Sequence, residues 1–227
     1  MVVQPDVENY RRDFPCCLSR RFLLRSADSF RWTMISLILA SQSPYRQQLL
    51  IDAGYSVTAI PSGIPEPDPA LFPDPEAALV HLAELKARTV QQRGAQGLIL
   101  AADTVGLVAG QMFGKPLDRE DARRMLLAIS GTLHEVLTGW CLLRTRDQLS
   151  VSGLERTRIT MRPWTKSELD AYLAGGEWEG KCGAYGLLLP NDPFVTHIEG
   201  SAANVIGLPL ERLREVLNEF PTLAEIC

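Results

Sequence analysis

LILASQSPYRQQLL, residues 37–50, is the most informative stretch of this chain. Its first four residues form an apolar run of strand length, and Ser43-Pro44 is typical of a helix N-cap followed by proline at the first helical position. The stretch therefore predicts a strand, a tight turn and a helix. Such a turn directs unpaired backbone N–H groups and the positive end of the helix dipole toward one point, which suits an anion.

Three side chains of this predicted turn are candidates for binding the anion. Ser41 and Ser43 supply hydroxyl groups, and Arg46 lies in the first helical turn. The planar guanidinium of an arginine can reach a phosphate through two hydrogen bonds. The alternative, about equally compatible with composition, is a well-capped strand–helix unit that binds nothing.

The composition restricts the class of protein. The chain has 227 residues, of which 46% are hydrophobic, and a formal net charge of −4. This is enough for one large α/β domain, and the acidic balance argues against nucleic acid or a membrane as a general partner. The cysteines and histidines show no zinc-binding spacing, so we expect reduced thiols, a cytoplasmic location and no structural zinc. The longest apolar stretch, 98–108, is too short to cross a bilayer.

Residues 1–33 differ from the remainder of the chain. They contain six arginines, four acidic residues and no sustained hydrophobic period, and they lack the apolar core of a secretory signal. We predict a poorly ordered N-terminal extension over 1–33, with Met34 as an alternative start, a functional domain over 34–220 and a short tail over 221–227.

Periodicity and turn signals predict an α/β order of elements. Strands are expected at 37–40, 56–60, 97–102, 133–143, 148–161, 194–199 and 203–206. Helices are expected at 44–54, 75–92, 119–129, 165–175 and from Pro209 onward. The strands at 133–143 and 148–161 should form an antiparallel ribbon.

Two charged residues in the first half of the chain are further candidates. Glu66 lies between Pro65 and Pro67, which restrict its backbone, although a solvated loop acid is the alternative. Lys86 lies in the middle of the apolar stripe of the 75–92 helix, so its ammonium is directed toward the buried side. An unpaired buried charge is costly, so we expect an anionic partner unless the side chain extends to water.

Two more candidates follow the most apolar strand. Asp103 comes directly after GLILAA (97–102), and in open α/β sheets ligands gather at the carboxyl ends of strands. A structural or capping aspartate is the alternative. Residues 105–113 predict a hairpin that returns Lys115 toward Asp103. The Gly-Lys at 114–115 is not a phosphate-binding P-loop, because Ala109 occupies the position of its first glycine.

Together these candidates describe a site with several cations and two carboxylates. Hydrolysis of a nucleoside triphosphate requires cations and backbone donors for the phosphates. It also requires carboxylates that hold a divalent metal and orient or deprotonate the attacking water.

Seven segments resemble, in order, the motifs of the Maf family of nucleotide pyrophosphatases, named after septum formation. They are LILASQSPYRQQLL, LAELKA (82–87), AADTV (101–105), GKP (114–116), SGTLHEVLTG (130–139), GAYG (183–186) and GSAANVIGLPL (200–210). The resemblance implies an α/β fold similar to that of inosine-triphosphate pyrophosphatases, with an elongated mixed sheet, flanking helices and a cleft between two lobes. It also implies hydrolysis of nucleoside triphosphates, non-canonical ones included, to the monophosphate and pyrophosphate.

The same resemblance implies roles for particular residues. Asp103 would be the proton acceptor, assisted by Lys86 and Lys115, and Glu66 with Asp103 would hold Mg²⁺ or Mn²⁺. The substrate-binding group would be Ser41, Ser43, Tyr45 and Arg46, with Lys86 and Lys115 also on the phosphates. A homodimer is a further expectation. The alternative function is a nucleotide-binding regulator of cell division with little catalysis.

The resemblance leaves the preferred base open. Tyr45 stands where many relatives have a second arginine, as in the branch that resembles 7-methyl-GTP pyrophosphatases. GAYG and GSAANVIGLPL resemble the dTTP/UTP branch, but Leu188 replaces its usual glutamine. Pro65 replaces the usual aspartate of the acidic loop, which leaves Glu66 as its carboxylate.

Overall fold

The computed structural model describes residues 35–66, 72–189 and 191–219, and the following account is confined to them. The predicted extension over 1–33, the alternative start at Met34 and the tail over 221–227 lie outside the described residues.

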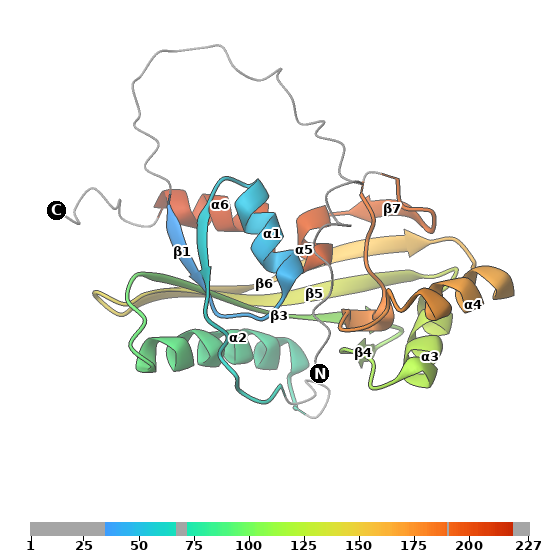
Figure 1. Ribbon diagram of the computed structural model, residues 1–227, viewed down its shortest axis with the longest axis horizontal. Helices are drawn as coiled ribbons and strands as arrows, with labels where there is room; N and C mark the ends of the chain where they lie inside the picture. Colours follow the sequence, from blue (N-terminus) through green and yellow to red (C-terminus); the bar gives the residue numbers. More distant parts are fainter. Residues whose placement is uncertain (1–34, 67–71, 190, 220–227) are drawn as a thin grey trace, which may run out of the picture. The chain divides into compact units, whose positions relative to one another are not determined.

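A seven-stranded mixed sheet is the centre of the fold (Figure 1). Its strand order is β2-β1-β3-β5-β6-β7, with β4 paired to the end of β3. β1 is parallel to β2 and β3, whereas β3, β5, β6 and β7 pair antiparallel. The strands are β1 (Ser36–Leu39), β2 (Ser56–Ala59), β3 (Leu98–Val108), β4 (Gln111–Phe113), β5 (Leu133–Arg144), β6 (Leu149–Met161) and β7 (Val195–Glu199). The predicted α/β class with a mixed sheet is confirmed.

Helices flank this sheet on both faces. They are α1 (Pro44–Asp52), α2 (Pro75–Gln92), α3 (Arg119–Ile129), α4 (Lys166–Gly175), α5 (Ala202–Ile206) and α6 (Leu210–Glu219), with a short 3₁₀ helix η3 (Cys182–Ala184). In Figure 1, α2 lies on one face of the sheet, and α1 and α6 lie on the other. None of the helices in the described ranges is long and apolar enough to span a membrane.

The run GLILAA is apolar throughout because both faces of β3 are covered. Successive strand residues point to opposite faces. Leu98 and Leu100 pack into the core beneath α1 and α6, and Ile99 and Ala101 pack into the core against α2. A strand buried on both faces reads as a continuous hydrophobic run rather than an alternating one.

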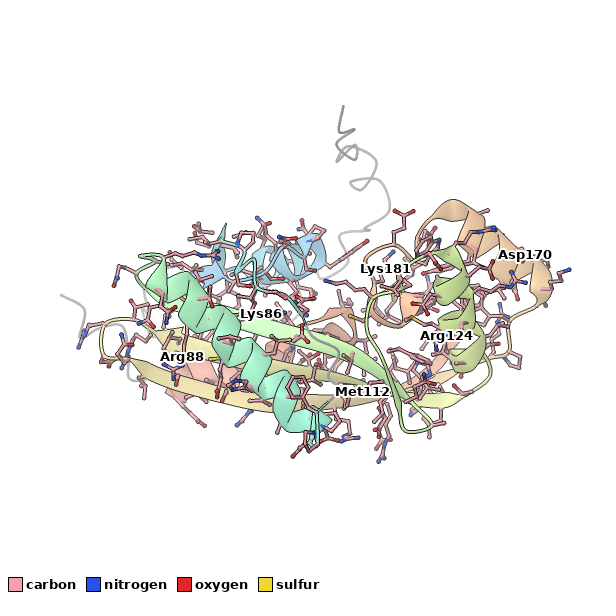
Figure 2. The ribbon with its side chains drawn as sticks, turned by 90° about the horizontal axis from the view of Figure 1, so that it is seen from below. Lys86, Arg88, Met112, Arg124, Asp170 and Lys181 are labelled. Carbon is pink, nitrogen blue, oxygen red and sulfur yellow. The ribbon has the colours of Figure 1, made fainter. Side chains whose placement is uncertain are left out.

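A separate core lies at the other end of the sheet. Buried residues of α3 and α4 pack there with β4, β6 and aromatic side chains, among which Trp164 stacks on Phe194 with ring centroids 3.7 Å apart. α3 and α4 lie side by side (Figure 2), and Arg123 Nη1 is 2.8 Å from Asp170 Oδ1. Thr165 and Glu168 form a capping box at the start of α4.

Two sequence predictions about elements are wrong. β3 does not end at Ala102 but continues to Val108, because the antiparallel partner β5 pairs with it from Leu98 to Leu107. The residues predicted as a strand at 203–206 belong to helix α5. The Ser201 side chain accepts the N–H of Asn204, and Gly207 ends the helix at φ 125°, so local capping outweighs the strand preference of the short apolar run.

Candidate active site

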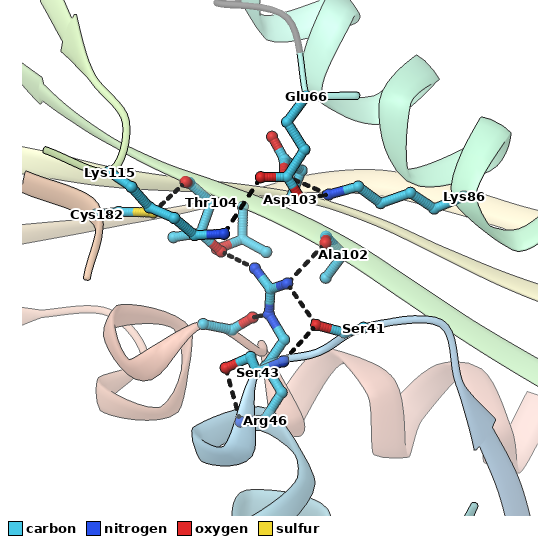
Figure 3. Close-up of polar contacts among 12 residues, drawn as sticks. Ser41, Ser43, Arg46, Glu66, Lys86, Ala102, Asp103, Thr104, Lys115 and Cys182 are labelled. Carbon is cyan, nitrogen blue, oxygen red and sulfur yellow. Dashed lines mark hydrogen bonds and ion pairs between the residues drawn. The ribbon is translucent and has the colours of Figure 1, made fainter. Parts of the chain in front are cut away.

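The turn between β1 and α1 forms as the sequence predicts. Ser43 is the N-cap of α1, where its Oγ accepts the backbone N–H of Arg46 at 3.4 Å. The Ser43 N–H donates in turn to Ser41 Oγ at 3.1 Å. Both serine side chains therefore shape the turn (Figure 3).

Arg46 ties this turn to two distant parts of the chain. Its Nε donates to the Gly207 carbonyl at 2.9 Å, and Nη1 donates to the Ala102 carbonyl at 2.9 Å and to Ser41 Oγ at 3.2 Å. Nη2 donates to Thr104 Oγ1 at 2.9 Å. Four of the five N–H groups of the guanidinium are thus engaged with the protein. Phosphate binding by Arg46 stays a prediction, and a contact through two hydrogen bonds would require it to exchange one of these partners.

The hydroxyl that accepts from Arg46 begins a buried hydrogen-bonded chain. Thr104 Oγ1 lies 3.0 Å from Thr138 Oγ1, which donates to the Asn204 carbonyl at 3.5 Å. The Asn204 amide donates to Thr157 Oγ1 at 3.1 Å, and both Thr138 and Asn204 are fully buried. The orientation of the guanidinium therefore depends on polar groups of β5, β6 and α5.

α2 packs directly on the backbone of β5 beside Asp103. Gly139 pairs with Asp103 across the sheet, and a Cβ at Gly139 would lie 2.4 Å from the Leu79 carbonyl carbon. Only glycine therefore permits this approach. Lys86 lies seven residues, or about two helical turns, beyond Leu79 on the same face of α2.

Lys86 joins the two predicted carboxylates. Its side chain is 3% exposed, and its Nζ lies 2.6 Å from Glu66 Oε1 and 2.6 Å from Asp103 Oδ1. The prediction that this ammonium points to the buried side and has an anionic partner is confirmed. Figure 3 shows the three side chains converging, with Asp103 on β3 and Lys86 reaching it from α2.

Lys115 completes this charged group from the β3–β4 hairpin. Its Nζ lies 3.3 Å from Glu66 Oε2, so Lys115 forms an ion pair with Glu66 rather than with Asp103. Burial alone would raise the pKa of Glu66. The charges and hydrogen bonds of Lys86 and then Lys115 outweigh burial and lower that pKa to about 2. Glu66 is therefore ionised at neutral pH.

Glu66 and Asp103 are also the candidate metal ligands. In the described ranges no three or more histidine, cysteine, aspartate and glutamate side chains are grouped so as to hold a metal ion. Mg²⁺, however, is often bound through one or two carboxylates together with substrate phosphates. Glu66 and Asp103 converge on one point, because each has an oxygen 2.6 Å from the Lys86 ammonium. This arrangement fits a metal ion that is bound by both carboxylates and by the phosphates of a nucleotide.

The segment around η3 is a part of the site that sequence reasoning missed. The Cys182 thiol donates to the Thr104 carbonyl at 2.7 Å, and the Gly183 N–H donates to the Gly114 carbonyl at 2.9 Å. Burial raises the pKa of Cys182 to about 11, so its thiol is a neutral donor. The Lys181 ammonium lies 5.5 Å from the centroid of the Tyr45 ring. Glycines at 180, 183 and 186 are typical of a close backbone approach, but no pattern in the sequence indicates what Lys181 contacts.

Comparison with known proteins gives a consistent result. Residues 36–220 match the family described as Maf-like protein. The chain is 42% identical over 196 residues to a dTTP/UTP pyrophosphatase of Rhodopirellula baltica, with 84% of each chain covered. It is also 42% identical over 186 residues to a dTTP/UTP pyrophosphatase of Anaeromyxobacter sp., with 80% of this chain and 87% of that protein covered.

More distant proteins extend this comparison. A dTTP/UTP pyrophosphatase of Bdellovibrio bacteriovorus is 36% identical over 191 residues, with 82% of this chain and 98% of that protein covered. A solved dITP/XTP pyrophosphatase of Mycobacterium abscessus is 15% identical with a TM-score of 0.38, and 84% of this chain and 100% of that chain are covered.

Proposed function

This chain belongs to the family of Maf-like proteins and is a nucleoside triphosphate pyrophosphatase, and we propose that dTTP and UTP are its preferred substrates. Relatives that are 36–42% identical over most of the chain are named dTTP/UTP pyrophosphatases. The motifs GAYG and GSAANVIGLPL support the same branch.

The arrangement around Tyr45 also supports this choice of base. Tyr45 is the residue that resembles the 7-methyl-GTP branch, and an aromatic ring at this place could stack on a purine base. In the structure its ring lies beside the Lys181 ammonium, 5.5 Å from the ring centroid. A cation–π contact gives the ring a role other than purine stacking.

The observation that carries the proposal for catalysis is the Lys86 ammonium held between Glu66 and Asp103. Asp103 Oδ1 accepts from Lys86, so we assign the other oxygen, Oδ2, to take a proton from water. The water oxygen forms a bond to the α-phosphorus, and the bond from that phosphorus to the α–β bridging oxygen breaks. Pyrophosphate leaves with the electron pair, and the nucleoside monophosphate remains.

The remaining charged groups stabilise the negative charge of the substrate in this proposal. Lys86 and Lys115 lie beside the reacting phosphates, and Ser41, Ser43 and Arg46 form the turn that faces them. Mg²⁺ or Mn²⁺, held by Glu66 and Asp103 together with the phosphates, would neutralise charge on the phosphate oxygens.

The charged group favours an enzyme over a nucleotide-binding regulator of cell division. A protein that only binds nucleotide has no need of a carboxylate held by a buried lysine, and Asp103 with Lys86 forms such a pair. A cytoplasmic location and a homodimer remain proposals. The cytoplasmic location is supported by Cys141 and Cys182, because both are free thiols and thiols stay reduced in the cytoplasm.

The proposal is tested with a panel of nucleoside triphosphates that includes dTTP, UTP, dCTP, GTP and 7-methyl-GTP, each with Mg²⁺ or Mn²⁺. We expect the monophosphate and pyrophosphate as products, with orthophosphate released after inorganic pyrophosphatase is added. The highest kcat/KM should belong to dTTP and UTP. Direct release of orthophosphate with a diphosphate product would contradict the reaction, and a preference for 7-methyl-GTP would contradict the base assignment.

A further inference from the structure

The Lys86 ammonium and the candidate metal ion depend on the same carboxylate oxygens. Glu66 Oε1 and Asp103 Oδ1 each lie 2.6 Å from Lys86 Nζ. The proposed mechanism assigns these two carboxylates to Mg²⁺ or Mn²⁺, and Mg²⁺ binds oxygen at about 2.0–2.1 Å. Two cations that contact one oxygen lie close together and repel each other. The ammonium and a metal ion therefore compete for this pair of carboxylates.

The other oxygens of the two carboxylates do not offer an alternative pair. Glu66 Oε2 lies 3.3 Å from the Lys115 ammonium. Asp103 Oδ2 takes the proton from water in the proposed mechanism, and a bound cation lowers the proton affinity of its ligands. Figure 3 shows Lys86 and Lys115 approaching the carboxylates from opposite sides. Each of the four oxygens thus has a partner or a proposed role other than metal binding.

The formal charges of these side chains cancel. Glu66 and Asp103 carry two negative charges, and Lys86 and Lys115 carry two positive charges within ion-pair distance of them. Arg46 adds a further positive charge nearby, where it donates to the hydroxyl of the residue after Asp103. A group with this balance attracts a triphosphate and does not attract a divalent cation. Charge alone therefore favours the binding of nucleotide before metal.

The Lys86 ammonium can leave the carboxylates without movement of the backbone. The close approach of Leu79 to Gly139 fixes α2 against β5, but the ammonium stands at the end of a flexible four-carbon chain. Ammonium groups form strong, charge-assisted hydrogen bonds with phosphate as well as with carboxylate oxygens. A bound triphosphate can therefore accept from Lys86 in place of Glu66 and Asp103, and both carboxylates are then released together.

We propose that Lys86 controls metal binding: its ammonium holds Glu66 and Asp103 until a triphosphate binds, and then moves to the phosphates while the two carboxylates bind the divalent cation. The inference rests on the proposed pyrophosphatase function and adds the order in which nucleotide and cation bind. Coupling between two ligands is reciprocal, so the cation also tightens nucleotide binding by the same factor. Removal of the Lys86 charge should therefore create a metal site in the protein without nucleotide.

Titration of Mn²⁺ into the nucleotide-free, full-length protein gives the central test. Binding is measured as loss of the electron paramagnetic resonance signal of free Mn²⁺. We expect weak binding by the wild type and binding at least about 10-fold tighter by Lys86→Met, because one neighbouring charge changes proton binding by about one to three powers of ten. Lys86→Arg retains the charge and should bind Mn²⁺ as weakly as the wild type.

Three further variants locate the effect. Lys115→Met removes the same charge from a side chain that is 54% exposed and contacts Glu66, so it should tighten Mn²⁺ binding less than Lys86→Met does. Lys166→Met removes an exposed lysine of α4 and should leave Mn²⁺ binding unchanged. Addition of Glu66→Gln to Lys86→Met should abolish the gain, because one of the two carboxylates is lost.

A second substitution at position 86 covers the case in which Lys86→Met does not fold. Lys86→Gln also removes the charge, but its amide can still donate a hydrogen bond to a carboxylate. We expect the same gain in Mn²⁺ affinity. Circular dichroism at the temperature of the titration shows whether each variant is folded.

The outcomes separate this inference from the proposed function. A wild type that yields no pyrophosphate from any triphosphate contradicts the function, whereas the Mn²⁺ titrations still test the inference because they involve no turnover. Unchanged Mn²⁺ binding in a folded, uncharged variant of Lys86 overturns the inference alone. A gain that persists with Glu66→Gln, or that also occurs in Lys166→Met, would place the metal elsewhere and overturn it too.

Discussion

The two sides of the site hold their charges differently. On the α2–β3 side, the Lys86 side chain is 3% exposed and contacts two carboxylates at 2.6 Å. On the β4–η3 side, the Lys115 side chain is 54% exposed and lies 3.3 Å from Glu66. Charges interact more strongly where water is excluded. In the proposed mechanism, the buried side would perform the chemistry and the exposed side would contribute to substrate binding.

The largest expected effect is on the buried side. Asp103→Asn keeps the size of the side chain but removes the proton acceptor, so kcat should fall by about 10²- to 10⁴-fold. The circular dichroism spectrum should match that of the wild type. Activity close to the wild-type value would exclude Asp103 as the base. It would also contradict the proposal that the buried α2–β3 side performs the chemistry.

Lys86→Met should lower kcat/KM on the order of 10²-fold, because a buried charge near the phosphates is lost. From sequence alone, an unliganded buried cation would be a cost, and its removal would leave stability unchanged or higher. The structure reverses that expectation, since Glu66 and Asp103 would lose their shared partner. We expect a loss of up to about 3 kcal/mol in the free energy of unfolding by urea titration, reduced by the partial exposure of Glu66. Unchanged stability would mean that the pairing contributes nothing.

Thr138→Val tests whether the buried hydroxyl chain matters to the turn. The substitution keeps the shape of the side chain but removes the partner of Thr104, which in turn accepts from Arg46. We expect a loss of about 1–3 kcal/mol in unfolding free energy and a rise in KM, because a buried polar group loses a partner. Thr138→Ser retains the hydroxyl and should restore the KM. A rise in KM that is the same in both variants would point to packing instead.

Lys115→Met is the counterpart of Lys86→Met on the exposed side. Because solvent screens an exposed charge, we expect kcat/KM to fall about 10-fold or less and the melting temperature to stay unchanged. Steady-state kinetics and thermal melting of the two variants in parallel measure the contrast directly. Equal losses of kcat/KM would remove the distinction between the two sides.

The smallest expected effect concerns pH. The pKa of Glu66 is lowered from 4.5 to about 2, so the ionised form stabilises the folded state above pH 4.5. This stabilisation is lost as the pH falls from about 5 toward 2. Glu66→Gln should therefore be less stable than the wild type at pH 7, and the difference in melting temperature should shrink toward pH 2. A difference that is constant with pH would show that ionisation of Glu66 does not stabilise the fold.

The features that sequence reasoning predicted well are local ones. Helices 75–92 and 119–129 form over the predicted residues, since each begins at an aspartate N-cap and carries an apolar stripe. The direction of Lys86 follows from its place in such a stripe, and the structure supplies the two carboxylates as partners.

The features that were missed depend on residues far apart in the chain. The end of β3 is set by β5, which pairs with it beyond Asp103. Three of the four hydrogen bonds of Arg46 require carbonyl and hydroxyl groups from β3 and the residue after α5. The position of Lys181 depends on the absence of a side chain at Gly186 and on the Tyr45 ring. None of these contacts leaves a periodic pattern in the sequence.

The hydrogen bond from Arg46 to Gly207 has a consequence for how the protein is made. It joins residues that are 161 positions apart, so it cannot form during synthesis until Gly207 has left the ribosome. Contacts of such long range form late, because the chain must first be closed at an entropic cost. The turn at Ser41 and Ser43 is thus among the first parts of the fold to be synthesised and among the last to be completed. Nascent chains that stop short of α5 should contain β1 and α1 without a working site.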